Sequence, residues 1–187
     1  TEKYVKNPSY TGNNYSYWEG DKLGGYNPME NAEHFNKKYD TYQDISGLKP
    51  GKYRVSLKAY YRVGSSKEDY AAYTSGDYSS KQYAQLYAAS SNKTDYYTPI
   101  VLASSGRVKN SLGGSAAGVG KVTTQGGGWW SWTTYEYYIP DNMEAAALWF
   151  EAGYYNNSLE CEVGEDGKLR IGIRKSQQIN QDWTCID

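Results

Sequence analysis

The sequence predicts an all-β protein, folded as an antiparallel β-sandwich. Its 22 tyrosines, 6 tryptophans and 20 glycines, with many serines, threonines and asparagines, form a composition of strands and turns. Several short segments alternate apolar and polar residues, the period of a half-buried strand. Turn-forming residues separate these segments, as in sandwiches. We therefore expect two packed sheets in a single domain that spans residues 1–187.

The clearest strand runs from Tyr53 to Arg62, directly after a Pro50-Gly51 turn. One face of this strand is apolar and is expected to lie in a core: Tyr53, Val55, Leu57, Ala59 and Tyr61. The other face is cationic or aromatic and points away from the core: Arg54, Ser56, Lys58, Tyr60 and Arg62. Residues 38–45 precede the turn as another strand, so the two segments are expected to form a hairpin.

Further strands are expected at residues 83–88, 98–103, 132–139, 145–152, 159–163, 169–174 and from 182 onward. The segments 159–163 and 169–174 flank a turn-rich loop at 164–167, which predicts a second hairpin. Within it, Leu169, Ile171 and Ile173 alternate with Arg170, Gly172 and Arg174. We expect residues 31–35 to form a short helical turn, and residues 64–79 and 104–128 to form loops.

Charge and hydropathy limit the partners of this chain. A net charge of −1 gives no overall field for binding nucleic acid or an anionic membrane. No run of about eighteen apolar residues is present, so no membrane insertion is expected. Because the chain starts at Thr1 rather than Met, we expect a segment of a larger multidomain protein.

The residues needed for common catalytic sites are sparse. The glycine-rich run at residues 113–128 lacks the spacing of a phosphate-binding loop, and His34 is the only histidine. A glycosidase needs two carboxylates at a fixed separation, for which the candidates are Glu151, Glu160, Glu162 and Asp182. A solvated strand face explains the alternation of Glu160 and Glu162 better, so we expect no enzyme. Cys161 and Cys185 form either one disulfide or two buried thiols.

Three tryptophans after three glycines form the first candidate binding site. Trp129, Trp130 and Trp132 are too closely spaced to be buried together with ease, and exposed aromatic rings mark binding surfaces. Sugar rings stack their C–H groups on such rings, while their hydroxyls bind polar side chains. The alternative is that two of the three rings close one end of the sandwich.

Other aromatic and cationic residues extend this candidate site. Tyr60, Arg62 and Trp149 lie on the faces of their expected strands that point away from the core. If these strands are neighbours, the three side chains form an aromatic and cationic strip across one sheet. The alternative is a partly solvated face with cross-strand cation–π and ion pairs. Tyr154, Tyr155 and Asn156 follow Gly153 at a strand end, where loops carry function.

Two blocks of the chain resemble galactose-binding-like β-sandwiches of secreted bacterial proteins. The first block, residues 39–62, contains a Tyr42-Gln43 pair and a Leu-x-Pro-Gly-x-Tyr turn at residues 48–53. The second, residues 151–187, contains a Gly-x-Leu-Arg-Ile-Gly strand at residues 167–172 before a strand with Trp183. Together the blocks cover about a third of the chain, and they are more specific for fold than for function.

This resemblance implies a jelly-roll domain of the carbohydrate-binding-module kind, an accessory to glycan-degrading enzymes outside the cell or at the bacterial cell surface. The expected partners are a glycan and the neighbouring domains of the parent protein. No cofactor is required, although such domains often hold a structural calcium near the chain ends. The alternative function is a structural or adhesion module that packs against neighbouring domains and binds no sugar.

Overall fold

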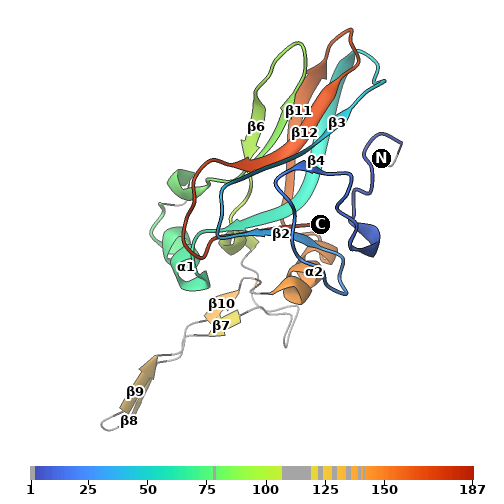
Figure 1. The fold of residues 1–187 in the computed structure, drawn as a ribbon. Helices are drawn as coiled ribbons and strands as arrows, with labels where there is room; N and C mark the ends of the chain where they lie inside the picture. Colours follow the sequence, from blue (N-terminus) through green and yellow to red (C-terminus); the bar gives the residue numbers. More distant parts are fainter. Residues whose placement is uncertain are drawn as a thin grey trace.

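The computed structural model of the chain describes residues 3–77, 79–106, 119–121, 124–127, 130–133, 136–138, 140 and 142–187. Two antiparallel sheets pack face to face, which is the arrangement of a β-sandwich (Figure 1). The five-stranded sheet has, in spatial order, β1 (Glu19–Gly20), β3 (Tyr39–Ile45), β12 (Leu169–Lys175), β5 (Gln85–Ala89) and β6 (Tyr96–Pro99). The four-stranded sheet has β11 (Asn156–Val163), β4 (Gly51–Arg62), β13 (Trp183–Ile186) and β2 (Ala32–Phe35). The predicted pair of antiparallel sheets is confirmed.

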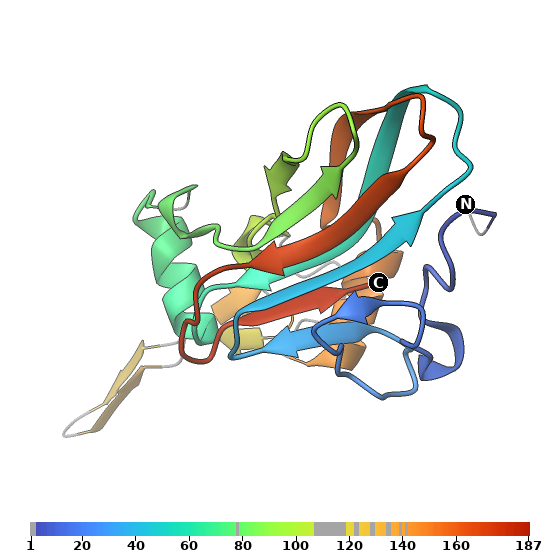
Figure 2. The same ribbon diagram turned by 45° about the horizontal axis from the view of Figure 1, so that its top comes forward.

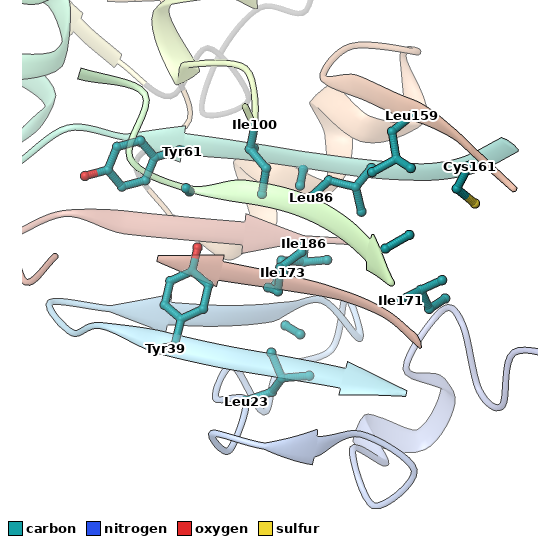
Figure 3. Packing of buried hydrophobic residues seen from close by; sticks show 14 of the residues in the cluster. Leu23, Tyr39, Tyr61, Leu86, Ile100, Leu159, Cys161, Ile171, Ile173 and Ile186 are labelled. Carbon is teal, nitrogen blue, oxygen red and sulfur yellow. The ribbon is translucent and has the colours of Figure 1, made fainter. Parts of the chain in front are cut away.

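The main core lies between the two sheets and follows the alternation read from the sequence. Ala59 and Tyr61 of β4 are fully buried, and Tyr53, Val55 and Leu57 pack against the core with partial exposure. Figure 3 shows how side chains of the two sheets meet in this layer, with Ile171 and Ile173 across from Leu159 and Cys161. The apolar parities of residues 53–62 and 169–174 are therefore confirmed as core.

Both predicted hairpins are wrong, although their strands exist. β3 pairs with β12, where Ile45 lies opposite Leu169, and β4 pairs with β11, where Val55 lies opposite Leu159. Each connection therefore crosses from one sheet to the other. Packed sheets are about 10 Å apart, a distance that five residues span easily at about 3.3 Å each. The two crossings lie side by side, since the Leu48 N–H donates a hydrogen bond to the Gly167 carbonyl at 3.1 Å.

Residues 145–152, expected to be a strand, belong instead to helix α2 (Met143–Glu151). The Asn142 side chain caps this helix by accepting a hydrogen bond from the Ala145 N–H at 2.8 Å. Three alanines with Met, Leu and Glu favour a helix over a strand. The helix lies on the outer face of the four-stranded sheet, where its buried side chains build a second core. The described chain thus has a third layer that the sequence did not predict.

Several smaller elements also differ from expectation. Helix α1 (Ser66–Thr74) forms in the expected loop at 64–79, and a capping box between Ser65 and Glu68 starts it. The expected helical turn at 31–35 is strand β2, and the strand expected at 98–103 is β6, which ends at Pro99. The regions expected as the loop 104–128 and the strand 132–139 contain two short strand pairs: β7 (Val119–Lys121) with β10 (Glu136–Tyr138), and β8 (Thr124–Gly127) with β9 (Trp130–Thr133). Single 3-10 turns occupy Thr11–Asn13, Ser79–Lys81 and Ala103–Gly106.

Candidate functional site

The structure brings three of the predicted site residues together, but inside the second core. Tyr60, Trp149 and Tyr155 are 0%, 2% and 5% exposed. The ring of Tyr155 lies 4.8 Å from that of Tyr60 and 5.7 Å from that of Trp149, centroid to centroid. The expectation that Tyr60 and Trp149 face away from a core is wrong, because α2 covers this half of the sheet. In this structure the three rings hold α2 to the sheet and present no open face to a ligand.

Three more predicted residues lie around that core. The Arg62 guanidinium lies 5.1 Å from the ring of Trp183 and its Nε donates to the Gly64 carbonyl at 3.2 Å. Tyr154 is partly buried against the second core. Asn156 is exposed at the start of β11, where its amide donates to the Gly153 carbonyl at 2.6 Å. Of these residues, only Asn156 is an exposed polar side chain.

The tryptophan cluster is described in part. Trp129 lies outside the described residues. The backbone of Trp130 and Trp132 belongs to β9, where Trp130 lies opposite Gly127 and Trp132 opposite Gln125 of β8. Trp130 and Trp132 therefore lie in a short pair of strands, which is set apart from the two sheets in both ribbon views (Figures 1 and 2).

A different group of side chains forms a strip across the outer face of the five-stranded sheet. In Figure 2 this sheet lies in front, with β12 between β3 and β5. Register aligns Tyr42, Gly172, Tyr87 and Tyr97 in one row across four strands. Arg170 and Arg174 flank Gly172 on β12, each two residues away and on the same face. We call Tyr42, Tyr87, Tyr97, Arg170 and Arg174 the arginine–tyrosine strip.

The first half of the strip is a bidentate ion pair stacked on a ring. Arg170 donates to both carboxylate oxygens of Asp44, at 2.8 and 2.7 Å. Its guanidinium carbon lies 3.8 Å from the centre of the Tyr42 ring. Two parallel hydrogen bonds and a stacking contact fix the orientation of a side chain that would otherwise rotate freely. The Arg170 and Asp44 side chains remain 39% and 52% exposed.

The second half of the strip has the most exposed ring. Arg174 donates to Asp95 at 2.5 Å and to the Gln85 amide oxygen at 3.0 Å. Its guanidinium carbon lies 4.8 Å from the ring of Tyr87 and 6.0 Å from that of Tyr97. Tyr87 is almost fully covered, whereas Tyr97 is 53% exposed. Tyr97 therefore offers an open aromatic face next to a guanidinium that is already held in place.

Gly172 lets the strip pack closely at its centre. A Cβ at this position would lie 2.5 Å from the Thr41 carbonyl oxygen, 2.8 Å from the Tyr87 ring and 2.9 Å from the Tyr42 Cβ. Any side chain here would push the two tyrosines apart. The glycine is thus required by the approach of its neighbours across both adjacent strands.

The charges of the strip are stabilised by these contacts. The hydrogen bond from Arg170 is the largest of the effects that lower the pKa of the Asp44 carboxyl, and the same bond raises the pKa of the Arg170 guanidinium. Burial, followed by the hydrogen bond from its hydroxyl to Asp40 at 2.7 Å, raises the pKa of Tyr87. These shifts favour the charged forms of Arg170 and Asp44 and the neutral form of Tyr87 at neutral pH.

Other titratable groups are buried where no substrate reaches them. The ammonium of Lys175 pairs with the carboxylate of Asp182, each side chain 1% exposed, and Asp182 also accepts from the Tyr61 hydroxyl at 2.9 Å. Burial raises the pKa of Asp182 in spite of these bonds. This pair ties β12 to the segment before β13. Among the other glycosidase candidates, Glu160 is an exposed partner of Arg54 at 3.3 Å.

Cysteines and metals add no further chemistry among the described residues. Cys161 and Cys185 are free thiols, buried in the main core and in the second core respectively. Of the two alternatives, the buried-thiol interpretation is confirmed. Within the described part of the chain, no three His, Cys, Asp or Glu side chains gather as a metal site. The described helices include none with the length and hydropathy needed to span a membrane.

No protein-family model matches the chain, and no curated protein matches it significantly. The function must therefore be argued from the geometry of the described residues and from the sequence resemblance.

A signal for the arginine–tyrosine strip was present in the sequence. The sequence predicts the alternation of Arg170, Gly172 and Arg174 and a strand that contains Tyr42. It does not predict the pairing of β3 with β12, because the turn signals favour a hairpin between each strand and its neighbour along the chain. Without that pairing, Tyr42 and Arg170 could not be placed beside one another.

Proposed function

We propose that this chain is a non-catalytic carbohydrate-binding module that binds a polysaccharide or oligosaccharide along the arginine–tyrosine strip. The observation that supports it most is the exposed ring of Tyr97 beside Arg174, which Asp95 and Gln85 hold in place. A sugar ring can stack its C–H groups on the aromatic face. Its hydroxyls can accept hydrogen bonds from guanidinium groups and donate them to carboxylates.

The order of the strip favours binding of a flexible glycan. Each arginine is already fixed by a carboxylate, so a ligand does not have to immobilise long side chains, which costs about 0.5–1.5 kcal/mol for each one. Neighbouring strands are about 4.8 Å apart, so the four strands of the strip extend over about 14 Å. This length accommodates several linked sugar units.

The sequence resemblance supports the same proposal and extends it. It implies a jelly-roll, galactose-binding-like domain that accompanies glycan-degrading enzymes at the cell surface or outside the cell. The partners would then be a glycan and neighbouring domains. A structural calcium near the chain ends is a separate proposal, and the described residues provide no cluster of three acidic, His or Cys ligands for it.

The tryptophan cluster, Trp129, Trp130 and Trp132, is the second proposed location for the glycan. The sequence supports it, since three closely spaced indoles provide large stacking surfaces. The strip and the cluster contain different aromatic residues, so substitutions distinguish the two locations.

The test is retention of the folded protein on a panel of polysaccharides by affinity gel electrophoresis. Tyr97→Ala and Arg174→Ala are expected to weaken binding about tenfold or more, the effect of removing a central contact. Tyr26→Ala is the matched control, because Tyr26 is 76% exposed and lies in the N-terminal segment. If Trp129→Ala and Trp130→Ala remove binding while Tyr97→Ala does not, the tryptophan cluster is the site. If the folded wild type is retained by no polysaccharide, the proposal fails.

A structural or adhesion module is the second candidate function. It is the alternative function that the sequence leaves open. The same binding panel separates the two functions, because such a module binds no sugar.

A further inference from the structure

The outer face of the five-stranded sheet has more negative than positive groups around the arginine–tyrosine strip. Register places three rows of side chains on this face, one through Gly172 and one on either side of it. These rows contain two guanidinium groups, those of Arg170 and Arg174. Four acidic side chains lie in the rows or reach them from the residue before β6: Glu19, Asp40, Asp44 and Asp95. Two positive groups against four negative ones give this part of the face a formal charge of −2.

The lysines of these strands do not change that balance within the rows. Lys38 precedes β3 and Lys168 precedes β12, and each lies beyond the three rows. Because β3 and β12 are antiparallel, the two lysines lie at opposite ends of the strand pair. The cations nearest to a ligand on the strip are therefore the two arginines.

Neither guanidinium group is available as a free cation. Arg170 donates to both oxygens of Asp44, at 2.8 and 2.7 Å, and Arg174 donates to Asp95 at 2.5 Å. Such a pair already has the geometry that a carboxylate or sulfate on a glycan would have to form with arginine. An anionic sugar could form that pair only by displacing Asp44 or Asp95, so it would exchange one ion pair for another and leave a carboxylate without its cation.

Two further carboxylates oppose a negatively charged ligand. Glu19 is exposed opposite Tyr42, and Asp40 is exposed opposite Arg174 and accepts a hydrogen bond from the Tyr87 hydroxyl at 2.7 Å. Within the described residues, neither Glu19 nor Asp40 forms an ion pair. A like charge about 4 Å away weakens binding about fivefold in water, and salt screens this repulsion.

Sugar hydroxyls suit the same surface without these costs. A hydroxyl both donates and accepts, so it can bind the carboxylate or the guanidinium of a pair while the pair stays closed. Both pairs are within reach of a ligand, since the Arg170 and Asp44 side chains are 39% and 52% exposed and those of Arg174 and Asp95 are 33% and 56% exposed. The ring of Tyr97, next to Arg174, provides the stacking surface.

We infer that the arginine–tyrosine strip binds neutral glycans and rejects glycans that carry uronate, sulfate or phosphate groups. This inference rests on the proposed function and names the ligand class of the same site. The closed arginine–carboxylate pairs provide donors and acceptors for hydroxyls, and the excess of carboxylates repels acidic substituents. Selectivity of this kind comes from an unfavourable contact with the wrong ligand as well as from favourable contacts with the right one.

The test compares neutral and anionic polymers with matched backbones by isothermal titration calorimetry at low ionic strength. The pairs are hydroxyethyl cellulose with carboxymethyl cellulose, galactan with polygalacturonate, and dextran with dextran sulfate. The folded wild type should bind the neutral member of at least one pair, and the anionic member of that pair at least about fivefold more weakly. Added salt should reduce the difference, because it screens the repulsion. Tyr97→Ala should weaken the binding of the neutral polymer.

A double variant tests whether the closed ion pairs cause the selectivity. Asp44→Asn with Asp95→Asn keeps the shape of both side chains and releases the two arginines, so affinity for the anionic polymers should rise at least about fivefold. Glu151→Gln with Glu165→Gln is the matched control, because it removes the same charge from exposed positions outside the strip. This control should leave both affinities unchanged. Thermal unfolding shows that each variant is folded.

Each contrary result has a distinct meaning. If the wild type binds an anionic polymer as tightly as its neutral counterpart, and Tyr97→Ala weakens both, the strip is a glycan site but the inferred ligand class is wrong. If the Asp44→Asn, Asp95→Asn variant gains no more affinity for anionic polymers than the control, the closed ion pairs do not cause the selectivity and the inference fails. If the folded wild type binds none of the six polymers, the proposed function fails and the inference with it.

Discussion

Replacing Trp149 with alanine distinguishes the observed helix from the strand that the sequence predicted. The side chain is 2% exposed, and its ring lies 5.1 Å from Tyr154 and 5.7 Å from Tyr155. Truncating a buried tryptophan costs about 3–5 kcal/mol, and the higher helix propensity of alanine returns about 0.5 kcal/mol of this. We expect a loss of about 3 kcal/mol, which lowers the melting temperature by about 6–12 °C in a domain of this size.

The assay is thermal unfolding followed by near-ultraviolet circular dichroism, with Glu151→Ala as the control. Glu151 is exposed near the end of the same helix, so its replacement should change stability by less than about 0.5 kcal/mol. A strand would place Trp149 and Glu151 on the same outer face and would predict similar, small effects for both. Equal melting temperatures for the two variants would refute the placement of α2 on the sheet.

Three further predictions concern other parts of the core and strip. Burial lowers the pKa of His34 to about 3 from 6.5, so the folded state binds fewer protons than the unfolded state between these values. The free energy of unfolding, measured in urea, should therefore fall as the pH drops below 6.5, by up to about 1.4 kcal/mol per pH unit. His34→Gln should remove this slope. Lys175→Met leaves the Asp182 carboxylate buried without its cation, so the free energy of unfolding in urea should fall by about 3–5 kcal/mol. Arg170→Ala removes an exposed ion pair and should lower it by less than about 1 kcal/mol. Gly172→Ala should cost about 1–3 kcal/mol in the same assay, because its Cβ meets backbone and two tyrosines.

Local patterns predicted the strands well. The period of two in residues 53–62 and 169–174 identified the core face of both strands, since a half-buried strand must alternate. The same pattern says nothing about which strand lies beside which. β3 and β4 are neighbours in the chain, yet a five-residue connection suits a sheet-to-sheet crossing as well as a hairpin. Pairing depends on contacts between distant residues, and these are not encoded in either segment alone.

The site was harder to predict than the fold for a related reason. Residues 145–152 have an apolar composition that fits a buried strand or a buried helix, and only the Asn142 cap and the run of alanines favour the helix. Because α2 covers the outer face of the four-stranded sheet, Tyr60 points outward from the main core but is buried in the second core. Conversely, Tyr97 lies in a segment whose expected strand began one residue later, at Thr98. Exposure of an aromatic ring depends on which neighbours cover it, so parity alone does not identify a binding face.

The most direct test of the proposed function is an NMR titration of the isotopically labelled chain with the polysaccharide fragment that retains it best. The account predicts that the backbone amides of Arg170, Gly172, Arg174 and Tyr97 shift together and saturate with one affinity. Tyr97→Ala should weaken that affinity about tenfold. Shifts confined to the indole resonances of Trp129, Trp130 and Trp132 would contradict the assignment of the arginine–tyrosine strip as the glycan site.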